Sequence, residues 1–180
     1  MAKGGIISAI HQGSLAEELE LVPGDKIISI NEQELTDIID LSFALADEEI
    51  EMLIEHENGE QEIIAFEKDI DEELGAEFES AVFGKIRQCA NNCYFCFVDQ
   101  VAPNMRDSLY IKDDDYRLSF LYGNFVTMTN MGPRDLERIH RLHLSPLYIS
   151  VHTTNPKLRG EMLRTKRGEL IMEQLAKLNE

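Results

Sequence analysis

The residues of this chain that are best suited to do chemistry are three cysteines lying within a stretch of eight residues. Cys89, Cys93 and Cys96 are its only cysteines, and their spacing is C-x3-C-x2-C. Clustered thiols indicate a metal site, whereas scattered thiols are typical of core packing or disulfides. Zinc and iron–sulfur sites both use thiolates, but both usually take four protein ligands. The sequence therefore predicts a metal site with one open position, which is typical of a catalytic centre.

Two other interpretations of the cysteines stay open. A zinc site could be completed by a distant histidine, namely His140, His143 or His152. Structural zinc sites usually bring their ligands in close-spaced pairs, and the sequence has no second pair after these cysteines. A buried, inert group of cysteines is the other interpretation, and the polar residues Asn91 and Asn92 in the same loop disfavour it.

The distribution of charge divides the chain into two modules. Residues 1–80 carry 3 Lys or Arg and 23 Asp or Glu, whereas residues 81–180 carry 14 and 11. Such a step marks a domain boundary, and the acidic first module would repel nucleic-acid phosphates. The sequence has no apolar run of about 18 residues and no apolar leader. We therefore expect no membrane partner and a cytoplasmic location, where thiols stay reduced and can bind iron.

The first module, residues 1–68, has the pattern of a small, mainly β domain. Turns rich in Gly, Pro and Asn separate short apolar runs, and Asn58-Gly59 predicts a hairpin between the last two runs. Thr36 is expected to cap the second of two helical segments. We expect strands at 4–10, 26–30, 51–55 and 61–66, and helical segments at 15–19 and 37–46.

This order of elements, with Gly13-Ser14-Leu15-Ala16 and the stretch from Leu21 to Asn31, resembles a PDZ domain of the bacterial protease-associated type. The resemblance implies a groove where an extended peptide adds a strand to a sheet edge and backbone N–H groups hold its terminal carboxylate. Gly4, Gly5 and Ile6 would form that carboxylate-binding loop. The surrounding acidity opposes a carboxylate-ended ligand, so an intramolecular ligand is as good an interpretation as a peptide partner.

The second module alternates strands with helices after an acidic linker at 69–80. Such alternation predicts parallel βαβ units, so the fold class is α/β preceded by the mainly β module. The triplet Asp113-Asp114-Asp115 is expected to be a solvated turn or a salt-bridge site. Strands are expected at 81–87, 124–130 and 147–152, and helices at 134–142, at 157–163 and up to 178.

The cysteine spacing, with an aromatic residue just before Cys96, resembles the signature of the radical S-adenosylmethionine (SAM) superfamily. Together with the PDZ-like start and segments 88–100, 116–124 and 150–154, it is similar to one bacterial family. That family joins a PDZ-like domain, a radical SAM domain and a C-terminal domain of unknown function (number 512). The resemblance implies a [4Fe-4S] cluster on Cys89, Cys93 and Cys96, whose open iron binds SAM. The reduced cluster would cleave SAM to a 5′-deoxyadenosyl radical, which acts on an unknown substrate.

The resemblance also suggests which residues contact SAM. Asn130 stands where most members of the superfamily have a Gly-Gly-Glu-like motif that contacts the SAM amino group. Ser150 and His152, at the end of the third predicted strand, are the other candidates for SAM or substrate contact. The activity further implies an electron donor as a partner.

Residues 81–180 are long enough for only the N-terminal half of such a barrel. We therefore expect a truncated chain that can bind a cluster but does not turn over, because barrel active sites draw on several strand ends. The alternative function is a PDZ-led interaction protein whose cysteines hold a structural or electron-transfer iron–sulfur site, or zinc.

Overall fold

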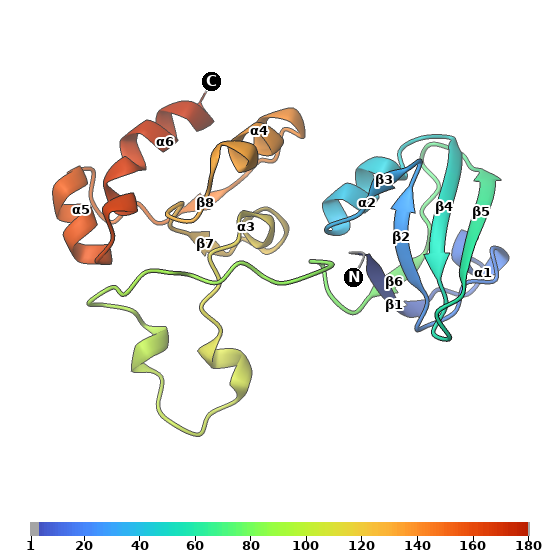
Figure 1. The fold of residues 1–180 in the computed structure, drawn as a ribbon, viewed down its shortest axis with the longest axis horizontal. Coiled ribbons are helices and arrows are strands. Elements are labelled where there is room, and N and C mark those ends of the chain that lie inside the picture. Colours follow the sequence, from blue (N-terminus) through green and yellow to red (C-terminus); the bar gives the residue numbers. More distant parts are fainter. Residues whose placement is uncertain (1–3, 180) are drawn as a thin grey trace. The chain divides into compact units, whose positions relative to one another are not determined.

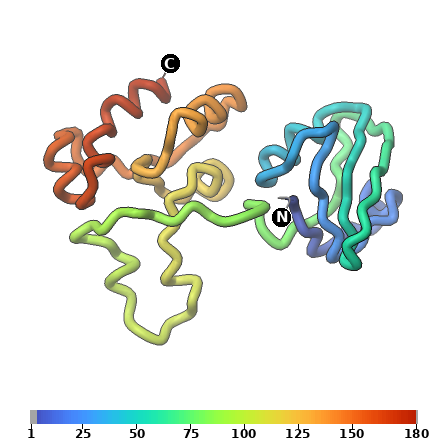
Figure 2. The backbone as a smooth tube through the Cα atoms, viewed as in Figure 1, coloured from blue at the N-terminus to red at the C-terminus, as the bar shows by residue number. Residues whose placement is uncertain are grey.

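The computed structural model describes residues 4–179, and the chain divides into two compact units. The first unit ends at Lys85 and the second begins at Ile86. Figures 1 and 2 colour the first unit from blue to green and the second from green to red. Each unit is described by itself.

The first unit is built on an antiparallel sheet with the strand order β5-β4-β2-β1-β6, and β3 pairs with β2 (Figure 1). Every element predicted for residues 4–66 is confirmed, and the ends differ by at most two residues. The strands are β1 (Gly5–Ile10), β2 (Lys26–Ile30), β3 (Gln33–Glu34), β4 (Glu49–Glu55), β5 (Gln61–Glu67) and β6 (Ala76–Phe78), and the helices are α1 (Leu15–Glu18) and α2 (Ile38–Ala44).

Side chains along the strands of this unit alternate between the hydrophobic core and the surface. In β4, Ile50, Met52 and Ile54 are buried, and the residues between them face outward or are half-buried. Helix α2 begins after Asp37, not Thr36 as predicted, because the Asp37 carboxylate accepts from two backbone N–H groups of the first turn. The hydroxyl of Thr36 donates instead to Asp40.

Strand β6 lies inside the segment predicted to be a linker, residues 69–80. Its backbone pairs with β1, with Phe78 opposite Ile7 and Ala76 opposite Ile10. Leu74 and Phe83, on either side of β6, are buried in the core of the unit. The acidic residues between them are exposed to solvent. The high charge of this segment therefore led to its prediction as a linker, although it contains a strand that completes the sheet.

The second unit contains a parallel βαβ arrangement. Strands β7 (Phe125–Val126) and β8 (Tyr148–Ile149) are parallel neighbours, and α4 (Pro133–Arg141) connects them. Figure 1 shows α3 (Tyr116–Tyr122) before this arrangement, and α5 (Pro156–Leu163) and α6 (Ile171–Leu178) after it. Three short 3-10 turns complete the unit, at Val98–Gln100, Asp107–Tyr110 and Lys166–Leu170.

The structure differs from the expectations for residues 81–178 in three ways. Residues 81–87 form no strand. Within them only Val82 makes an isolated bridge, to Asp37, and the bridge of Gln88 to Asp113 follows the segment. The two remaining strands have two residues each, since the backbone beyond them bonds to side chains of Asp114 and Arg159. Helix α3 was not predicted, although Asp115 caps its start and left-handed Gly123 ends it.

Figure 2 shows the long path between β6 and α3, where the 3-10 turns at 98–100 and 107–110 are the only helices or strands in the described residues. The cysteines lie on this path, so loops and not strands carry them. None of the helices within residues 4–179 is long and apolar enough to span a membrane.

Candidate functional site

The three cysteines line one pocket of about 400 Å³ in the second unit. Ser150 and His152, which directly follow β8, line the same pocket. The thiols are free and half-buried. The structure therefore places in one pocket five residues that were predicted from the sequence to bind the cluster or to contact SAM.

Backbone hydrogen bonds to distant segments hold the cysteine loop in place. The N–H of Cys89 donates to the carbonyl of Lys112 at 2.7 Å. The N–H groups of Asn92 and Tyr94, on either side of Cys93, donate to the carbonyls of Leu163 and Met162 at the end of α5. Because these partners lie far away in the sequence, the loop depends on the fold of the whole unit.

A buried polar network lies behind the loop. The carboxylate of Asp114 accepts from the backbone N–H of Thr127 and, at 2.7 Å, from its hydroxyl. The side chain of Asn91 bonds to the hydroxyls of Thr127 and Thr129, both at 2.9 Å. Asn91 lies between Cys89 and Cys93, so the network reaches directly into the cysteine loop.

The acidic triplet is therefore not a solvated turn. Asp114 is 1% exposed and Asp115 is fully buried. Asp115 caps α3 and forms an ion pair with Arg117 at 2.6 Å, so the salt-bridge alternative holds for this residue. Asp113 accepts a hydrogen bond from Asn124 at 2.7 Å. Consecutive side chains point into different environments, and no local pattern in the sequence indicates which environment each one meets.

The chemistry of the thiols fits a metal centre. Burial raises the pKa of Cys89 and of Cys93, and the neighbouring thiols raise the pKa of Cys93 further. Three thiolates in one half-buried pocket therefore need a positive partner, which a metal centre would supply. Within residues 4–179, no three His, Cys, Asp or Glu side chains converge on a single ion. In a cubane cluster each cysteine binds a different iron, so its thiolates stand farther apart than around one ion.

Aromatic rings form part of the remaining wall of the pocket. Phe95, Phe97 and Phe125 line it, together with polar groups of Asn124 and other residues. The rings of Phe95 and His152 lie 5.1 Å apart. Burial lowers the pKa of His152, so its imidazole is neutral at pH 7 and offers one donor and one acceptor. Sequence analysis pointed to the aromatic residue before Cys96, which is Phe95, but it missed Asn124 and Phe125.

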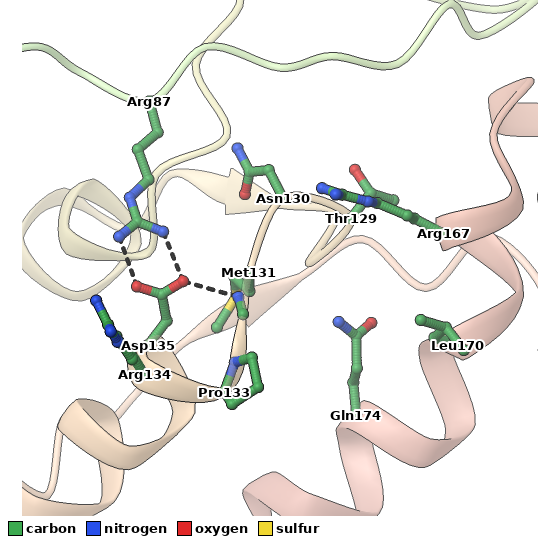
Figure 3. Close-up of a pocket in the computed structure, with 11 residues that line it drawn as sticks. Arg87, Thr129, Asn130, Met131, Pro133, Arg134, Asp135, Arg167, Leu170 and Gln174 are labelled. Atoms are coloured by element: carbon green, nitrogen blue, oxygen red, sulfur yellow. Dashed lines mark hydrogen bonds and ion pairs between the residues drawn. The ribbon is translucent and has the colours of Figure 1, made fainter.

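Asn130 lines a different pocket, of about 770 Å³, which Figure 3 shows in close-up. There Arg87 and Asp135 form a bidentate ion pair, and Asp135 also accepts from the backbone N–H of Gly132 at 2.8 Å. The Asn130 side chain donates to the carbonyl of Gln88 at 3.4 Å. The structure thus separates Asn130 from the pocket of Ser150 and His152, and its contact with SAM stays a prediction.

The predicted peptide-binding residues lie at and just before the start of β1. Gly4 and Gly5 are buried, whereas Ile6 is partly exposed. Strand β1 has neighbours on both sides, since β2 pairs with one edge and β6 with the other. The backbone N–H of Glu79 donates to the carbonyl of Ile6. The chain's own residues 76–79 therefore occupy the edge that an added peptide strand would need.

Comparison with known families assigns different families to the two parts of the chain. A family model described as a radical SAM-like domain matches residues 68–180, which is more than half of the chain. The chain belongs to this radical SAM-like family. A second model, described as a PDZ domain, matches residues 6–56. A comparison with curated proteins found no match.

The two matches confirm the resemblances found in the sequence for both modules of this radical SAM-like protein. The part of the predicted arrangement that involves domain of unknown function 512 is not matched and stays a prediction. The radical SAM-like match begins at residue 68, before β6, although β6 belongs structurally to the first unit.

Proposed function

We propose that this chain is the cluster-binding and SAM-binding part of a radical SAM enzyme, with Cys89, Cys93 and Cys96 as ligands of a [4Fe-4S] cluster. The observation that carries the proposal is the shared pocket, where three free thiols meet Ser150 and His152. The family match supports the same activity. A substrate and an electron donor, both unidentified, complete the proposal.

The residues of the pocket have distinct roles in this proposal. When bound, the cluster would supply the electron that cleaves SAM. The hydroxyl of Ser150 and the neutral imidazole of His152 would hydrogen-bond to the polar groups of SAM. The rings of Phe95, Phe97 and Phe125 would exclude water from the reacting groups, which strengthens each polar contact inside the pocket.

The first prediction concerns cluster assembly. Anaerobic reconstitution of the wild-type protein with iron and sulfide should load about four irons per chain and give a broad absorbance near about 400 nm. Cys93→Ser should lose most of this iron, because one of only three ligands is gone. The matched control Ser108→Ala changes a hydroxyl in the loop region outside the pocket and should load normally. A colourless wild-type protein with one zinc per chain contradicts the proposal.

The second prediction separates the enzyme from the alternative, a PDZ-led interaction protein with a structural or electron-transfer site. Cluster-loaded protein should bind SAM in equilibrium dialysis, and His152→Gln should weaken that binding roughly tenfold through one lost polar contact. His143→Gln is the control, because His143 is exposed and does not line the pocket. Cluster loading without any SAM binding favours the interaction protein.

For the first unit, we propose that the PDZ-like groove takes an intramolecular ligand and not a separate peptide. The supporting observation is the pairing of β6 with β1, which already supplies the added strand. Phe83 follows that strand and packs against the core, much as a ligand side chain fills a pocket.

A further inference from the structure

The pocket of about 770 Å³ that Asn130 lines is also lined by three arginine side chains, Arg87, Arg134 and Arg167. We call it the arginine pocket. It shares no lining residue with the pocket of the three cysteines. The hydroxyl of Thr127, which lines the cysteine pocket, and that of Thr129, which lines the arginine pocket, are 2.9 Å apart. The two pockets are therefore separate neighbours just after β7.

Two amide oxygens of the arginine pocket lack hydrogen-bond donors. Within residues 4–179, the only buried side-chain polar atoms without a partner are the amide oxygens of Asn130 and Gln174, and both residues line this pocket. Gln174 is 8% exposed, and its amide nitrogen donates to the carbonyl of Met128 at 2.9 Å, so the oxygen is the free end of the amide. In Figure 3 the Gln174 side chain extends from α6 toward the loop of Thr129 and Asn130. A buried acceptor without a donor costs about 1–3 kcal/mol, so the pair indicates a bound molecule with hydrogen-bond donors.

The charges of the lining favour an anion. Arg87 is paired with Asp135. The guanidinium groups of Arg134 and Arg167, in contrast, form no ion pair or hydrogen bond within the described residues. Two uncompensated positive charges repel a cation and attract an anion. Arginine binds carboxylate and phosphate groups through paired N–H donors.

We propose that the arginine pocket binds an organic anion that also carries N–H donors, at a site separate from the cysteine pocket. Its carboxylate or phosphate group pairs with Arg134 and Arg167, and its amide or amino group donates to the oxygens of Asn130 and Gln174. The last side-chain torsion of Asn and Gln is broad, so each amide can turn its oxygen toward a ligand. Apolar lining such as Leu170 suits the carbon skeleton. The proposal requires no cluster, so it goes beyond the proposed function and can fail independently of it.

Three probes with the same four-carbon skeleton separate the two requirements. Succinamate carries a carboxylate and an amide N–H₂ group, monomethyl succinate carries only the carboxylate, and succinamide carries only the N–H donors. In isothermal titration calorimetry of the full chain, succinamate should bind roughly tenfold more tightly than either of the other probes. Equal affinities for all three probes, or no binding of any, overturn the inference.

Two variants of α4 test the anion subsite with the same chemical change. Arg134 and Arg141 are both exposed, but only Arg134 lines the pocket. Arg134→Gln should weaken succinamate binding roughly tenfold, because a charge-assisted hydrogen bond is lost. Arg141→Gln should bind succinamate like the wild type. Equal affinities of the two variants contradict the proposal.

Gln174→Met tests the donor subsite. It removes the unpaired oxygen and should lower the affinity for succinamate to that for monomethyl succinate. The change also removes the donor to Met128, so circular dichroism must first show that the variant is folded. If it is not folded, Arg134→Gln decides the question, because its exposed position leaves the fold intact. An unchanged affinity in folded Gln174→Met contradicts the proposed donor contact.

Competition experiments identify the anion and separate the site from that of SAM. Competition by inorganic phosphate or by acetate confirms the anion subsite and shows which anion the arginines prefer, whereas competition by neither overturns it. On cluster-loaded protein, succinamate should stay bound when SAM is added in excess. Displacement by SAM, which also carries a carboxylate and an amino group, overturns the separate site. A chain that takes up no cluster contradicts the proposed function, and the calorimetry without a cluster still tests this inference.

Discussion

The side chain of Arg159 connects several segments of the second unit. It is fully buried, and its guanidinium donates to four backbone carbonyls from three segments of the unit. Only a planar, branched donor group can serve so many acceptors at once. The three N–H donors of lysine all belong to one nitrogen atom, so a lysine side chain cannot reproduce this arrangement.

The third prediction follows from this geometry. Arg159→Lys should lower the free energy of unfolding of the second unit by about 3 kcal/mol, because it leaves buried carbonyls without donors. Arg134→Lys is the matched control, since Arg134 is exposed and should change stability by less than about 0.5 kcal/mol. Denaturant titration measures both. Equal midpoints for the two variants would show that the carbonyls find other donors.

The fourth prediction concerns His56 in the first unit. Its ring nitrogens contact the buried carboxylate of Asp25 at 2.9 Å and Glu62 at 3.3 Å. The hydrogen bond to Asp25, and next that to Glu62, raise the pKa of His56 above its ordinary value of 6.5. A raised pKa means that the pair stabilises the fold fully below pH 6.5 and loses this effect as pH rises through the folded-state pKa.

Thermal unfolding checks this pH dependence. The difference in melting temperature between the wild type and His56→Gln should be greatest below pH 6.5 and should shrink at alkaline pH. A difference that stays constant over the whole range would mean that His56 acts through packing and not through its charge.

The cysteines and the aspartates show which roles of single residues can be predicted from a sequence and which cannot. Cys89, Cys93 and Cys96 could be grouped from the sequence because their spacing along the chain already limits the distance between them, and all three line one pocket. Asp114 was missed, because its role depends on Thr127, which a turn and a helix separate from it. Local spacing predicts local sites, whereas partners brought together by the fold leave no pattern.

Among the elements, β6 best shows how composition can mislead. Its segment is acidic, yet Leu74, Phe78 and Phe83 within or beside it pack onto the first unit. Helix α3 was missed for a related reason, because its capping residue Asp115 was interpreted as part of a charged turn. The hairpin of β4 and β5 was predicted correctly, since both its alternation and its Asn-Gly turn are local.

The fifth prediction tests how closely β6 fits its neighbour. A Cβ atom on Gly5 would lie 2.5 Å from the ring of Phe83 and 2.7 Å from that of Phe78. Gly5→Ala should therefore push this segment away from β1 and destabilise the first unit by about 2 kcal/mol. The amides of β6 should exchange with solvent faster in the variant.

Gly84→Ala is the control for this test, because a Cβ atom there meets nothing within 4 Å. Equal exchange rates in β6 for both variants would show that the segment tolerates displacement. The intramolecular-ligand proposal would then lose its support.

At the scale of the whole molecule, charge placed the boundary between the modules after residue 80, and the structure divides the chain after Lys85. The two positions differ because residues 81–85 lack the acidic character of the first unit and yet still contact it. Ala81 and Phe83 bond through their backbones to Ile38 and Thr36. The order of the modules could be predicted, whereas the exact boundary depends on these contacts.

The family match adds a practical point, since it begins at residue 68, within the first structural unit. A chain that ends at residue 67 would lose β6 and the buried side chains of Leu74 and Phe83. Each of these side chains contributes about 2 kcal/mol when buried. Expression trials should therefore cut after Lys85 when the first unit is wanted alone.

The attachment of the cysteine loop to α5 has a consequence for the order of synthesis. Domains fold as they leave the ribosome, N-terminal parts first. The backbone N–H groups on either side of Cys93 cannot form their hydrogen bonds until Met162 and Leu163 have been synthesised. The side chain of Asn91 likewise depends on Thr127 and Thr129, which come 36 and 38 residues later. While those residues are still being translated, the thiols sit on an unanchored nascent chain. The pocket proposed to hold the cluster therefore takes its final form only after α5 has emerged, so we expect iron to be delivered at a late or post-translational stage of maturation.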